Sequence, residues 1–327
     1  MAKKRLVSGM RTTGSLHLGH LEGTLKNWVA LQDTYDCFFF AAVWHAFTDR
    51  LKIDNLPSLI REMIVDWLSV GIDPEKAVIF RQSAMHEHAE LATILANCTP
   101  LGWLERCPTF KDAVRDDEAR SSVTLGKLMY PVLMTADIAV YNAAAVPVGK
   151  DQLPHLELSR EIIRRFNSAF GDILTEPEAV LSQVPLLIGI DKRKMSKSYN
   201  NGIDLRESPE GLKNKIQQMI TDPQRVRRND PGDPEVCTVY AYHKIYTPDR
   251  LAEIAEGCRT AGLGCRDCKL MLFERLNAML EPIRSRRAEI EARHGYIEEV
   301  LEAGEKRAHL VASEVMQQIR QVMGFLL

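Results

Sequence analysis

Residues 37–44, CFFFAAVW, constrain the fold of this chain more than any other stretch. The run is continuously apolar, whereas a strand with one face in water alternates apolar and polar side chains. It therefore predicts a strand buried on both faces, as in a parallel sheet covered by helices. Shorter apolar runs at 6–7 and 77–80 predict further strands, and the helical periodicity of 55–70 predicts a helix between two of them. This alternation predicts an α/β fold with a Rossmann-like parallel sheet.

The segment 13–20, TGSLHLGH, follows the first predicted strand and begins a predicted helix with Ser15 as its N-cap. A helix N-terminus presents backbone N–H groups and favours anions such as phosphate. His17 and His20 lie three residues apart and can both donate to phosphate or ribose oxygens. Gly19 between them allows a flat ligand to approach the backbone. The segment is a candidate nucleotide site, with a packing role for the histidines as the alternative.

Asp137 is the one acid in the strongly apolar predicted helix 125–141. A carboxylate in such surroundings is costly unless it finds a donor, so it caps local backbone, pairs with a cation or meets a ligand. His45 follows the predicted strand 37–44, at the ligand-binding edge of such a sheet, where a functional role and a packing role are equally compatible with the sequence. The sequence alone leaves these alternatives open.

Another predicted strand, 146–148, leads through Gly149 into a turn that carries Asp151 and Gln152. A carboxylate at such a turn can hold ribose hydroxyls, and an amide can hold an α-amino acid. These two side chains are therefore further candidate ligand-binding residues.

The segment 194–198, KMSKS, completes a pair of motifs with the histidine turn. Together they resemble the two signatures of class I aminoacyl-tRNA synthetases. The first has the form HxGH, filled by residues 17–20, and the second matches letter for letter. A small-molecule adenylyltransferase also uses an HxGH turn, but such an enzyme leaves the rest of this chain unexplained.

Several further stretches resemble the tryptophanyl-tRNA synthetase family over nearly the whole chain. They are WHAFT at 44–48, YPVLMTADI at 130–138, and VPVG-DQ at 146–152 with the HLEL and RRFN that follow it. The resemblance implies ATP-dependent activation of L-tryptophan to tryptophanyl-adenylate, transfer to the terminal ribose of tRNA(Trp), and release of AMP and diphosphate. It also implies Mg²⁺ and a homodimer.

The resemblance implies a role for each matching residue. His17, His20, Lys194 and Lys197 are the implied catalytic residues, which contact the ATP phosphates. The implied remaining ATP-binding residues are Gly19, Gly149, Asp151, Met195 and Ser196. The implied tryptophan-binding residues are Tyr130, Met134, Asp137, Val148, Gln152 and His45, with Asp137 accepting the indole N–H. Arg11 and Thr12 stand where many members have glutamine and proline, which puts the conformation of that loop in doubt.

These implied roles agree with the chemistry. A carboxylate is already a nucleophile at neutral pH, so its attack on the α-phosphorus of ATP needs positioning and charge neutralisation rather than a base. Lysine ammonium groups suit the leaving diphosphate. A tyrosine hydroxyl can also donate to Asp137, so a tyrosyl-tRNA synthetase is one rival interpretation. A regulatory RNA-binding paralogue without synthesis activity is another, against which the intact signatures argue.

The predicted domain organisation is a Rossmann-like catalytic domain at 1–190 and a helical anticodon-binding domain at 191–327. A mobile insertion is expected near 98–122, where short polar segments contain proline and glycine. The last helix is expected to return to the catalytic domain. Arg225, Arg227 and Arg228 are expected to contact tRNA phosphates.

Four cysteines lie in the helical part, with gaps of twenty, six and two residues: Cys237, Cys258, Cys265 and Cys268. Without a secretory signal, a set ending in CxxC fits a metal site better than disulfides. Zinc and a four-iron four-sulfur cluster both accept four thiolates. A subset of tryptophanyl-tRNA synthetases carries such a cluster near the anticodon-binding region with similar spacing, which favours iron-sulfur over zinc.

The bulk composition is that of an ordinary globular protein, with 327 residues, 45% apolar, 26% charged and a formal net charge of −2. The N-terminus lacks the apolar core of a signal peptide, and no run approaches the roughly 20 apolar residues of a membrane span. The sequence therefore predicts a cytoplasmic protein without a membrane partner.

Overall fold

The computed structural model describes residues 3–12, 14–48, 51–114, 122–181, 187–193, 195, 199 and 201–325. The chain divides into two compact units. Unit 1 comprises Met1–Thr13, Asn27–Gln183 and Arg293–Leu327, and unit 2 comprises Gly14–Lys26 and Val184–Ala292. The predicted domain boundary at residue 190 remains a prediction.

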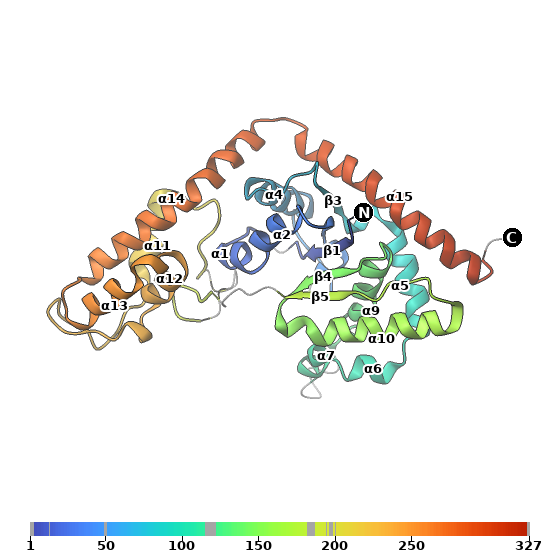
Figure 1. Ribbon diagram of the computed structural model, residues 1–327, viewed down its shortest axis with the longest axis horizontal. Coiled ribbons are helices and arrows are strands. Elements are labelled where there is room, and N and C mark those ends of the chain that lie inside the picture. The colour runs from blue at the N-terminus through green and yellow to red at the C-terminus, as the bar shows by residue number, and fades with distance from the viewer. Residues whose placement is uncertain are drawn as a thin grey trace. The chain divides into compact units, whose positions relative to one another are not determined.

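Unit 1 is built on a five-stranded parallel sheet with the strand order β3-β2-β1-β4-β5 (Figure 1). The strands are β1 (Arg5–Met10), β2 (Asp36–Ala41), β3 (Ala77–Arg81), β4 (Ala145–Val148) and β5 (Glu178–Leu181). The α/β fold class is confirmed, and so is the helical character of the C-terminal region. The predictions did not include β5, because its four residues EAVL are half exposed and too few to form a periodic pattern.

The interior strand β2 explains why residues 37–41 of the apolar run have no polar side chain, and residues 43–44 belong to the following helix α3 (Val43–Ala46). Phe39 stacks on Trp28 with ring centroids 4.2 Å apart, on one face of the sheet. Successive side chains of a strand point to opposite faces, and Phe38 accordingly stacks on Tyr141 at 4.8 Å. Both faces of β2 are therefore covered by helices, as the apolar run predicted.

The helices of unit 1 are α2 (Lys26–Leu31), α3 (Val43–Ala46), α4 (Leu56–Ser69), α5 (His86–Cys98), α6 (Leu101–Glu105), α7 (Pro108–Ala113), α9 (Leu125–Ala139), α10 (Leu153–Phe170) and α15 (Tyr296–Val322). Among them, α2, α4, α9, α10 and α15 correspond to predicted helical stretches with shifted ends, whereas α3, α5, α6 and α7 were not predicted. The expected insertion contains α6 and α7, and residues 115–121 lie outside the described part of the chain.

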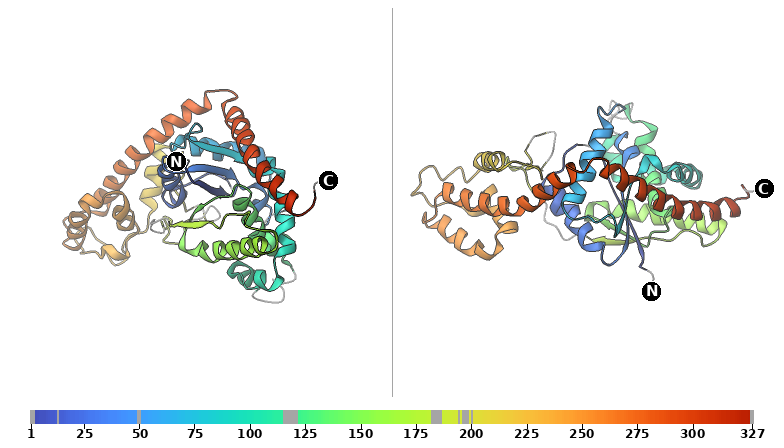
Figure 2. Two further views of the ribbon diagram at one scale, coloured as in Figure 1. Left: turned by 45° about the vertical axis from the view of Figure 1, so that its right-hand side comes forward. Right: turned by 90° about the horizontal axis from the view of Figure 1, so that it is seen from above.

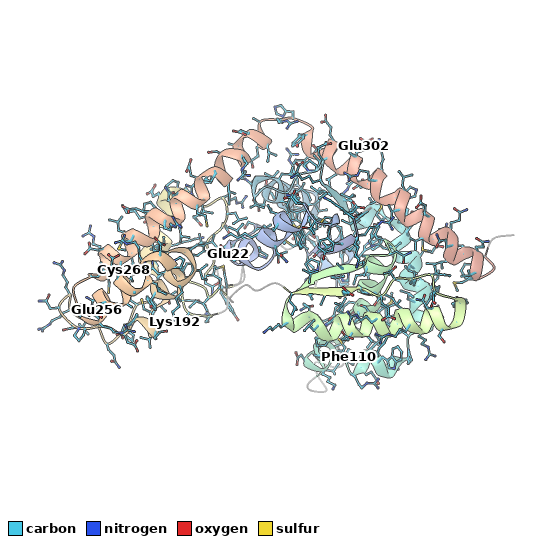
Figure 3. All side chains as sticks on the ribbon, in the orientation of Figure 1. Glu22, Phe110, Lys192, Glu256, Cys268 and Glu302 are labelled. Carbon is cyan, nitrogen blue, oxygen red and sulfur yellow. The ribbon has the colours of Figure 1, made fainter. Side chains whose placement is uncertain are left out.

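The edge strand β3 is covered by α15, the red helix in Figure 1, which Figure 2 shows from two further sides. The buried positions of α15 recur every three or four residues and include Gly304, Ala308 and Ala312, whereas Glu302 is exposed and labelled in Figure 3. A side chain at Gly304 would collide with the backbone of Ile79 in β3. The small residues therefore let α15 lie directly on the sheet edge, which blocks pairing with another strand.

Unit 2 is mainly helical. Its helices are α1 (Leu18–His20), the π-helical turn η1 (Leu21–Leu25), α11 (Pro209–Gln218), α12 (Thr238–Tyr246), α13 (Leu251–Arg259) and α14 (Cys265–Glu291). Buried leucines of α14 at 272, 276 and 280 lie on one face, and α14 packs against α11 and α12. No helix within the described residues is long and apolar enough to cross a membrane.

The first helix begins later than predicted. Its N-cap is His17, whereas the sequence predicted Ser15. The backbone stays extended before this point because Leu16 accepts a hydrogen bond from the N–H of Leu205, and the N–H of Leu18 donates to Ile203. These contacts with a distant segment override the local capping preference of serine.

Candidate functional site

Asp137 lies near the C-terminal end of α9 and is 2% exposed. Its Oδ1 accepts hydrogen bonds from Nε2 of Gln82 at 2.7 Å and from Nδ1 of His88 at 2.6 Å. Its Oδ2 accepts from Nε2 of His45 at 2.7 Å. The sequence left open whether this acid caps backbone, pairs with a cation or meets a ligand, and the structure gives it three side-chain donors.

The donors are themselves held in place. The backbone N–H of Trp44 donates to Oε1 of Gln82 at 2.9 Å, which fixes the amide with its NH₂ toward Asp137. His45 is carried by the short helix α3 directly after β2, at the carboxyl edge of the sheet. The site therefore lies where ligands bind in sheets of this kind.

The Asp137 carboxylate is ionised at physiological pH. Burial alone raises its pKa, but the charge and hydrogen bond of His45, together with His88, lower it to about 2. Asp137 is consequently an acceptor only, and its partners are donors.

Tyr130 lies on the same helix, with its ring in contact with the ring of His45 at a centroid distance of 6.4 Å. Its hydroxyl donates to Oγ1 of Thr109 at 2.9 Å and meets Nε2 of His155. Burial raises the pKa of Tyr130, so the hydroxyl stays protonated. The structure thus brings together His45, Tyr130 and Asp137 of the predicted tryptophan set, and Met134 is a half-buried residue of the same helix.

The end of β4 carries the predicted turn residues. Val148 is buried, and a side chain at Gly149 would meet Oδ1 of Asp151 at 2.6 Å. Asp151 and Gln152 are exposed, and Nε2 of Gln152 donates to Oδ2 of Asp151 at 2.8 Å. The carboxylate and the amide therefore lie together at the strand end, with the amide directed to Asp151 rather than to the Asp137 cluster.

In unit 2 the two histidines of the HxGH turn form a reciprocal cap. Nδ1 of His17 accepts from the N–H of Gly19 at 3.1 Å, and the N–H of His17 donates to Nδ1 of His20 at 3.2 Å. The imidazole rings are 3.9 Å apart. This arrangement holds both rings at the start of α1, where the helix dipole favours an anion.

Met195, from the second signature, lies against this turn. Its sulfur is within 3.5 Å of the position that a side chain on Gly19 would occupy, and its Cγ is within 3.2 Å of the corresponding position on Gly202. The methionine of the second signature therefore packs where Gly19 of the first signature has no side chain. Lys194, Ser196 and Lys197 lie outside the described residues.

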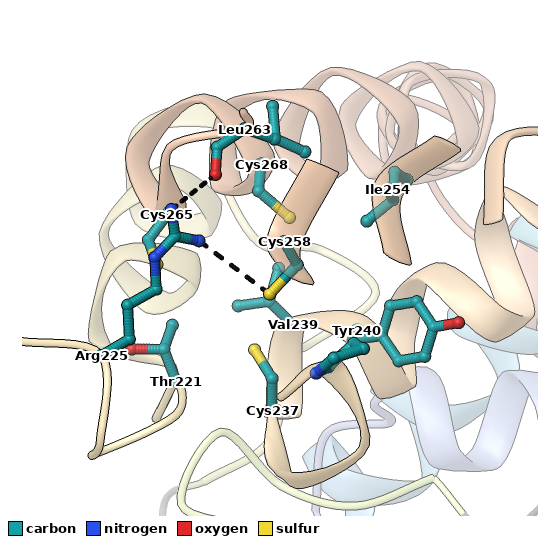
Figure 4. A pocket seen from close by; sticks show the side chains of 11 residues that line it. Thr221, Arg225, Cys237, Val239, Tyr240, Ile254, Cys258, Leu263, Cys265 and Cys268 are labelled. Atoms are coloured by element: carbon teal, nitrogen blue, oxygen red, sulfur yellow. Dashed lines mark hydrogen bonds between the residues drawn. The ribbon is translucent and has the colours of Figure 1, made fainter. Parts of the chain in front are cut away.

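The four cysteines of unit 2 line one pocket, and Figure 4 shows their side chains pointing into a common space. Cys237 precedes α12, Cys258 lies near the end of α13, and Cys265 and Cys268 occupy the first turn of α14. Three chain segments thus meet at the thiols. Figure 3 labels Cys268 near the start of α14.

The thiols influence one another electrostatically. Burial, followed by the charges of the three other cysteines, raises the pKa of Cys268 to about 12. Burial also raises the pKa of Cys258, while the nearby Arg225 opposes it. Among the residues that the structure describes, no group of three or more histidine, cysteine, aspartate and glutamate side chains is arranged to hold a metal ion.

Arg225 belongs to this pocket. Its guanidinium donates to the carbonyl oxygens of Arg228 at 3.0 Å and Leu263 at 2.9 Å, and it approaches the sulfur of Cys258 at 3.9 Å. The contact with tRNA phosphates that the sequence suggested for Arg225 stays a prediction. The guanidinium is engaged by the protein because the chain turns back at this point and places two carbonyls within its reach.

Sequence reasoning did not identify Gln82, His88 or Tyr141 as part of the site. The histidine and the glutamine fall in a stretch without a motif, and Tyr141 is one of several apolar residues after α9. Only the structure brings Gln82 and His88, which are 55 and 49 positions from Asp137, to its carboxylate, and Tyr141 to the imidazole of His88.

A family model described as class I tRNA synthetases (W and Y) matches residues 2–281. The tryptophan–tRNA ligase of Thermotoga maritima is 45% identical over 326 residues, which cover 98% of this chain and 99% of that protein. The tryptophan–tRNA ligase of Aquifex aeolicus is 40% identical, again over 98% of this chain and 99% of that protein.

A solved structure also resembles the chain closely. The tryptophanyl-tRNA synthetase from Campylobacter jejuni, complexed with ADP and tryptophan, has a TM-score of 0.86 and 34% sequence identity. The match covers 98% of this chain and 99% of that one. The similarity therefore extends over both units, including the helical part.

Proposed function

The chain belongs to the class I tRNA synthetases for tryptophan and tyrosine, and from this membership we propose that it joins L-tryptophan to tRNA(Trp). In the first step a carboxylate oxygen of tryptophan attacks the α-phosphorus of ATP, forming tryptophanyl-adenylate and releasing diphosphate. In the second, a hydroxyl of the terminal ribose of the tRNA attacks the activated carbonyl and AMP leaves. The protein must orient the reactants and neutralise charge.

The observation that supports tryptophan most directly is the buried, ionised Asp137 with its three donors. Indole offers one polar atom, an N–H that donates and cannot accept, and an acceptor-only carboxylate is complementary to it. An amino acid without a donor at this place would leave the carboxylate short of a partner, which a buried site penalises strongly. Charging assays with tRNA(Trp) and tRNA(Tyr) test this directly, since only the first should accept an amino acid.

The residues around Asp137 would complete the tryptophan site. We propose that Met134 and Val148 line the indole, that His45 lies beside it, and that Tyr130 and Gln152 bind the α-amino and carboxylate groups. The half-buried position of Met134, the contact between Tyr130 and His45, and the place of Val148 at the end of β4 support this assignment. Gln152 would exchange its hydrogen bond with Asp151 for one with the substrate.

The ATP site would use both signatures. His17 and His20 would contact the phosphates and adenosine, and Lys194 and Lys197 would hold the diphosphate as it leaves, together with Mg²⁺. Gly19, Met195 and Ser196 would support the nucleotide, while Gly149 and Asp151 would hold the ribose. The contact between Met195 and the HxGH turn supports a shared role for the two signatures.

We also propose that the four cysteines hold a four-iron four-sulfur cluster. The cluster would be held by four cysteine thiolates that come from three segments of unit 2. One zinc ion needs all four sulfurs about 2.3 Å from a single point. The four thiols line one shared pocket, which supports a common ligand set, and the similar cysteine spacing in a subset of the family favours the cluster over zinc.

The remaining assignments follow from the family. We propose that residues 1–190, together with the KMSKS loop at the start of 191–327, perform catalysis, and that the helical part of 191–327 binds the anticodon of tRNA(Trp). We further propose that the protein acts as a homodimer in the cytoplasm. The basic Arg227 and Arg228, whose side chains are exposed, are the candidates for phosphate contacts near the cysteine pocket.

A further inference from the structure

A chain of hydrogen bonds leads from Asp137 to a residue that cannot touch the substrate. Nδ1 of His88 lies 2.6 Å from Oδ1 of Asp137, and Nε2 of His88 lies 2.7 Å from the hydroxyl of Tyr141. The side chain of His88 and the residue Tyr141 are both fully buried. Tyr141 therefore contacts the carboxylate only through the imidazole.

The position of the His88 proton follows from these partners. A neutral imidazole has one N–H and one lone pair. If Nε2 carried the proton, the lone pair of Nδ1 would face the ionised carboxylate at 2.6 Å, which is repulsive. If Tyr141 donates to Nε2, the proton must lie on Nδ1 and points at Asp137. A doubly protonated ring would leave the Tyr141 hydroxyl proton without an acceptor among the described residues, so the neutral form satisfies every group.

The hydrogen bonds to Asp137 also show which of its carboxylate lone pairs is still available to accept a donor. Both lone pairs of Oδ1 are used by Gln82 and His88, and one lone pair of Oδ2 is used by His45. One lone pair of Oδ2 is left by these hydrogen bonds. Its direction is fixed only as long as the donors hold the carboxylate in one orientation.

We propose that Tyr141 is a positioning residue for tryptophan recognition, which donates to Nε2 of His88, holds the imidazole in place and so keeps the remaining acceptor of Asp137 directed at the indole N–H. The inference rests on the proposed role of Asp137. Without the hydroxyl, the lone pair of the buried Nε2 has no donor, so the imidazole turns toward another partner and the carboxylate loses a donor that held its orientation. The enzyme would then distinguish less sharply between substrates with and without an N–H at this position.

The test is Tyr141→Phe. The ring is packed against Phe38 and Phe80, and phenylalanine keeps these contacts. The measurement is kcat/KM in ATP–diphosphate exchange with L-tryptophan and with β-(3-benzothienyl)-L-alanine, in which sulfur replaces the N–H. A hydrogen bond of about 1.4 kcal/mol corresponds to a tenfold change. The expected result is about a tenfold smaller preference for tryptophan over the sulfur analogue. The change should arise from a higher KM for tryptophan, and the KM for ATP should be unchanged.

Two comparisons separate positioning from packing. Tyr242→Phe removes another buried tyrosine hydroxyl, which donates to the carbonyl of Ile188, and should leave the preference unchanged. Equal losses for both amino acids in Tyr141→Phe would overturn the proposal, because damaged packing affects both substrates alike.

A second pair of variants tests the position of the donor itself. Asparagine at position 88 offers an N–H donor near the place of Nδ1 whatever Tyr141 does, whereas glutamine reaches the place of Nε2. His88→Asn should keep the preference, His88→Gln should lose it, and adding Tyr141→Phe to His88→Asn should change nothing further. If Tyr141→Phe fails to fold, the two His88 variants decide the question, and equal preferences in both would overturn the proposal.

The outcome also separates this inference from the function it rests on. If Asp137→Ala leaves the preference for tryptophan intact, the proposed role of Asp137 fails and the inference fails with it. If Asp137→Ala reduces the preference while Tyr141→Phe and His88→Gln do not, Asp137 recognises the indole without help from Tyr141, and only the inference fails.

Discussion

Nε2 of His45 donates to Oδ2 of Asp137 at 2.7 Å, and this contact joins the residue after the central strand to the one acid of helix α9. Two segments about ninety residues apart thus form one recognition element. The contact leaves Asp137 charged, buried and oriented, as an indole donor requires.

Asp137→Ala should weaken tryptophan selectivity. Removal of the acceptor leaves the indole N–H unpaired and also leaves Gln82, His88 and His45 without their partner. A loss of about 100-fold in kcat/KM for tryptophan is expected, since sites built to hydrogen-bond a substrate lose this much or more when the pairing fails. The measurement is diphosphate exchange with tryptophan and phenylalanine. Thr135→Ala, which changes a buried hydroxyl of the same helix, is the control. A similar loss in both variants would contradict the assignment.

Tryptophan binding should not depend on the titration of Asp137 between pH 5 and 8. Its pKa of about 2 in the folded protein lies below the unfolded value of 3.8, so the carboxylate is ionised throughout this range, and its contribution is lost only as the pH falls toward 2. Equilibrium dialysis with labelled tryptophan measures this. A tenfold weakening centred above pH 4 that disappears in Asp137→Ala would show that the carboxylate titrates much higher.

His20→Ala and Lys197→Ala should lower the rate of adenylate formation without changing tryptophan affinity. Both residues are assigned to ATP, and removal of a charge or donor that acts on the phosphates costs about 100-fold. His20 also caps α1 by accepting the N–H of His17. His20→Asn, which keeps an acceptor, therefore separates the capping role from phosphate contact. Single-turnover rates equal to wild type in both alanine variants would remove the proposed roles.

Cys265→Ser should release the metal group. Serine is a poor ligand for iron and leaves three thiolates of the four. Iron and sulfide content and the visible absorption of anaerobically purified protein measure the effect. Cys98→Ser is the control, because this cysteine of unit 1 does not line the pocket, and it should retain the full iron and sulfide content. Full content in Cys265→Ser would refute the four-cysteine site, and stoichiometric zinc without iron in the wild-type protein would favour the alternative metal.

Gly304→Ala should destabilise unit 1. The new methyl group would overlap the carbonyl of Ile79, and backbone cannot move aside as a side chain does. Overpacking of this kind costs about 3 kcal/mol. Thermal and urea denaturation measure the loss. Gly102→Ala places a methyl group no closer than 3.6 Å to another atom and serves as the control. Equal stability of the two variants would show that α15 does not lie on β3 as described.

The sequence was sufficient for the parts of the fold that rest on local patterns. The apolar run of β2 predicted a doubly covered strand, and the helices predicted at 55–70 and 125–141 lie close to the true ends of α4 and α9. The predicted start of α1 was wrong by two residues, because hydrogen bonds with Ile203 and Leu205 keep the chain extended there. The packing of α15 on β3 was only a general expectation, since nothing local marks Gly304 as the contact.

The residues of the candidate site likewise include some that the sequence predicted and some that it could not. Asp137 stood out because an isolated acid in an apolar helix needs an explanation, and the two signatures stood out through their resemblance to a family. Gln82, His88 and Tyr141 could not be found from the sequence, since their role depends on three-dimensional proximity to one carboxylate and not on any spacing. The contacts of Arg225 with the cysteine pocket could not be predicted either, because a charge in a loop looks the same in sequence whether it faces solvent or a thiol pocket.

The most direct test is amino-acid-dependent exchange of labelled diphosphate into ATP, run with all twenty amino acids on anaerobically purified protein. The account predicts exchange with tryptophan alone, which would establish the reaction and the specificity of the Asp137 site together. Exchange with tyrosine alone would retain the fold but contradict the assignment of Asp137 to the indole, and no exchange with any amino acid would contradict the proposed enzymatic function.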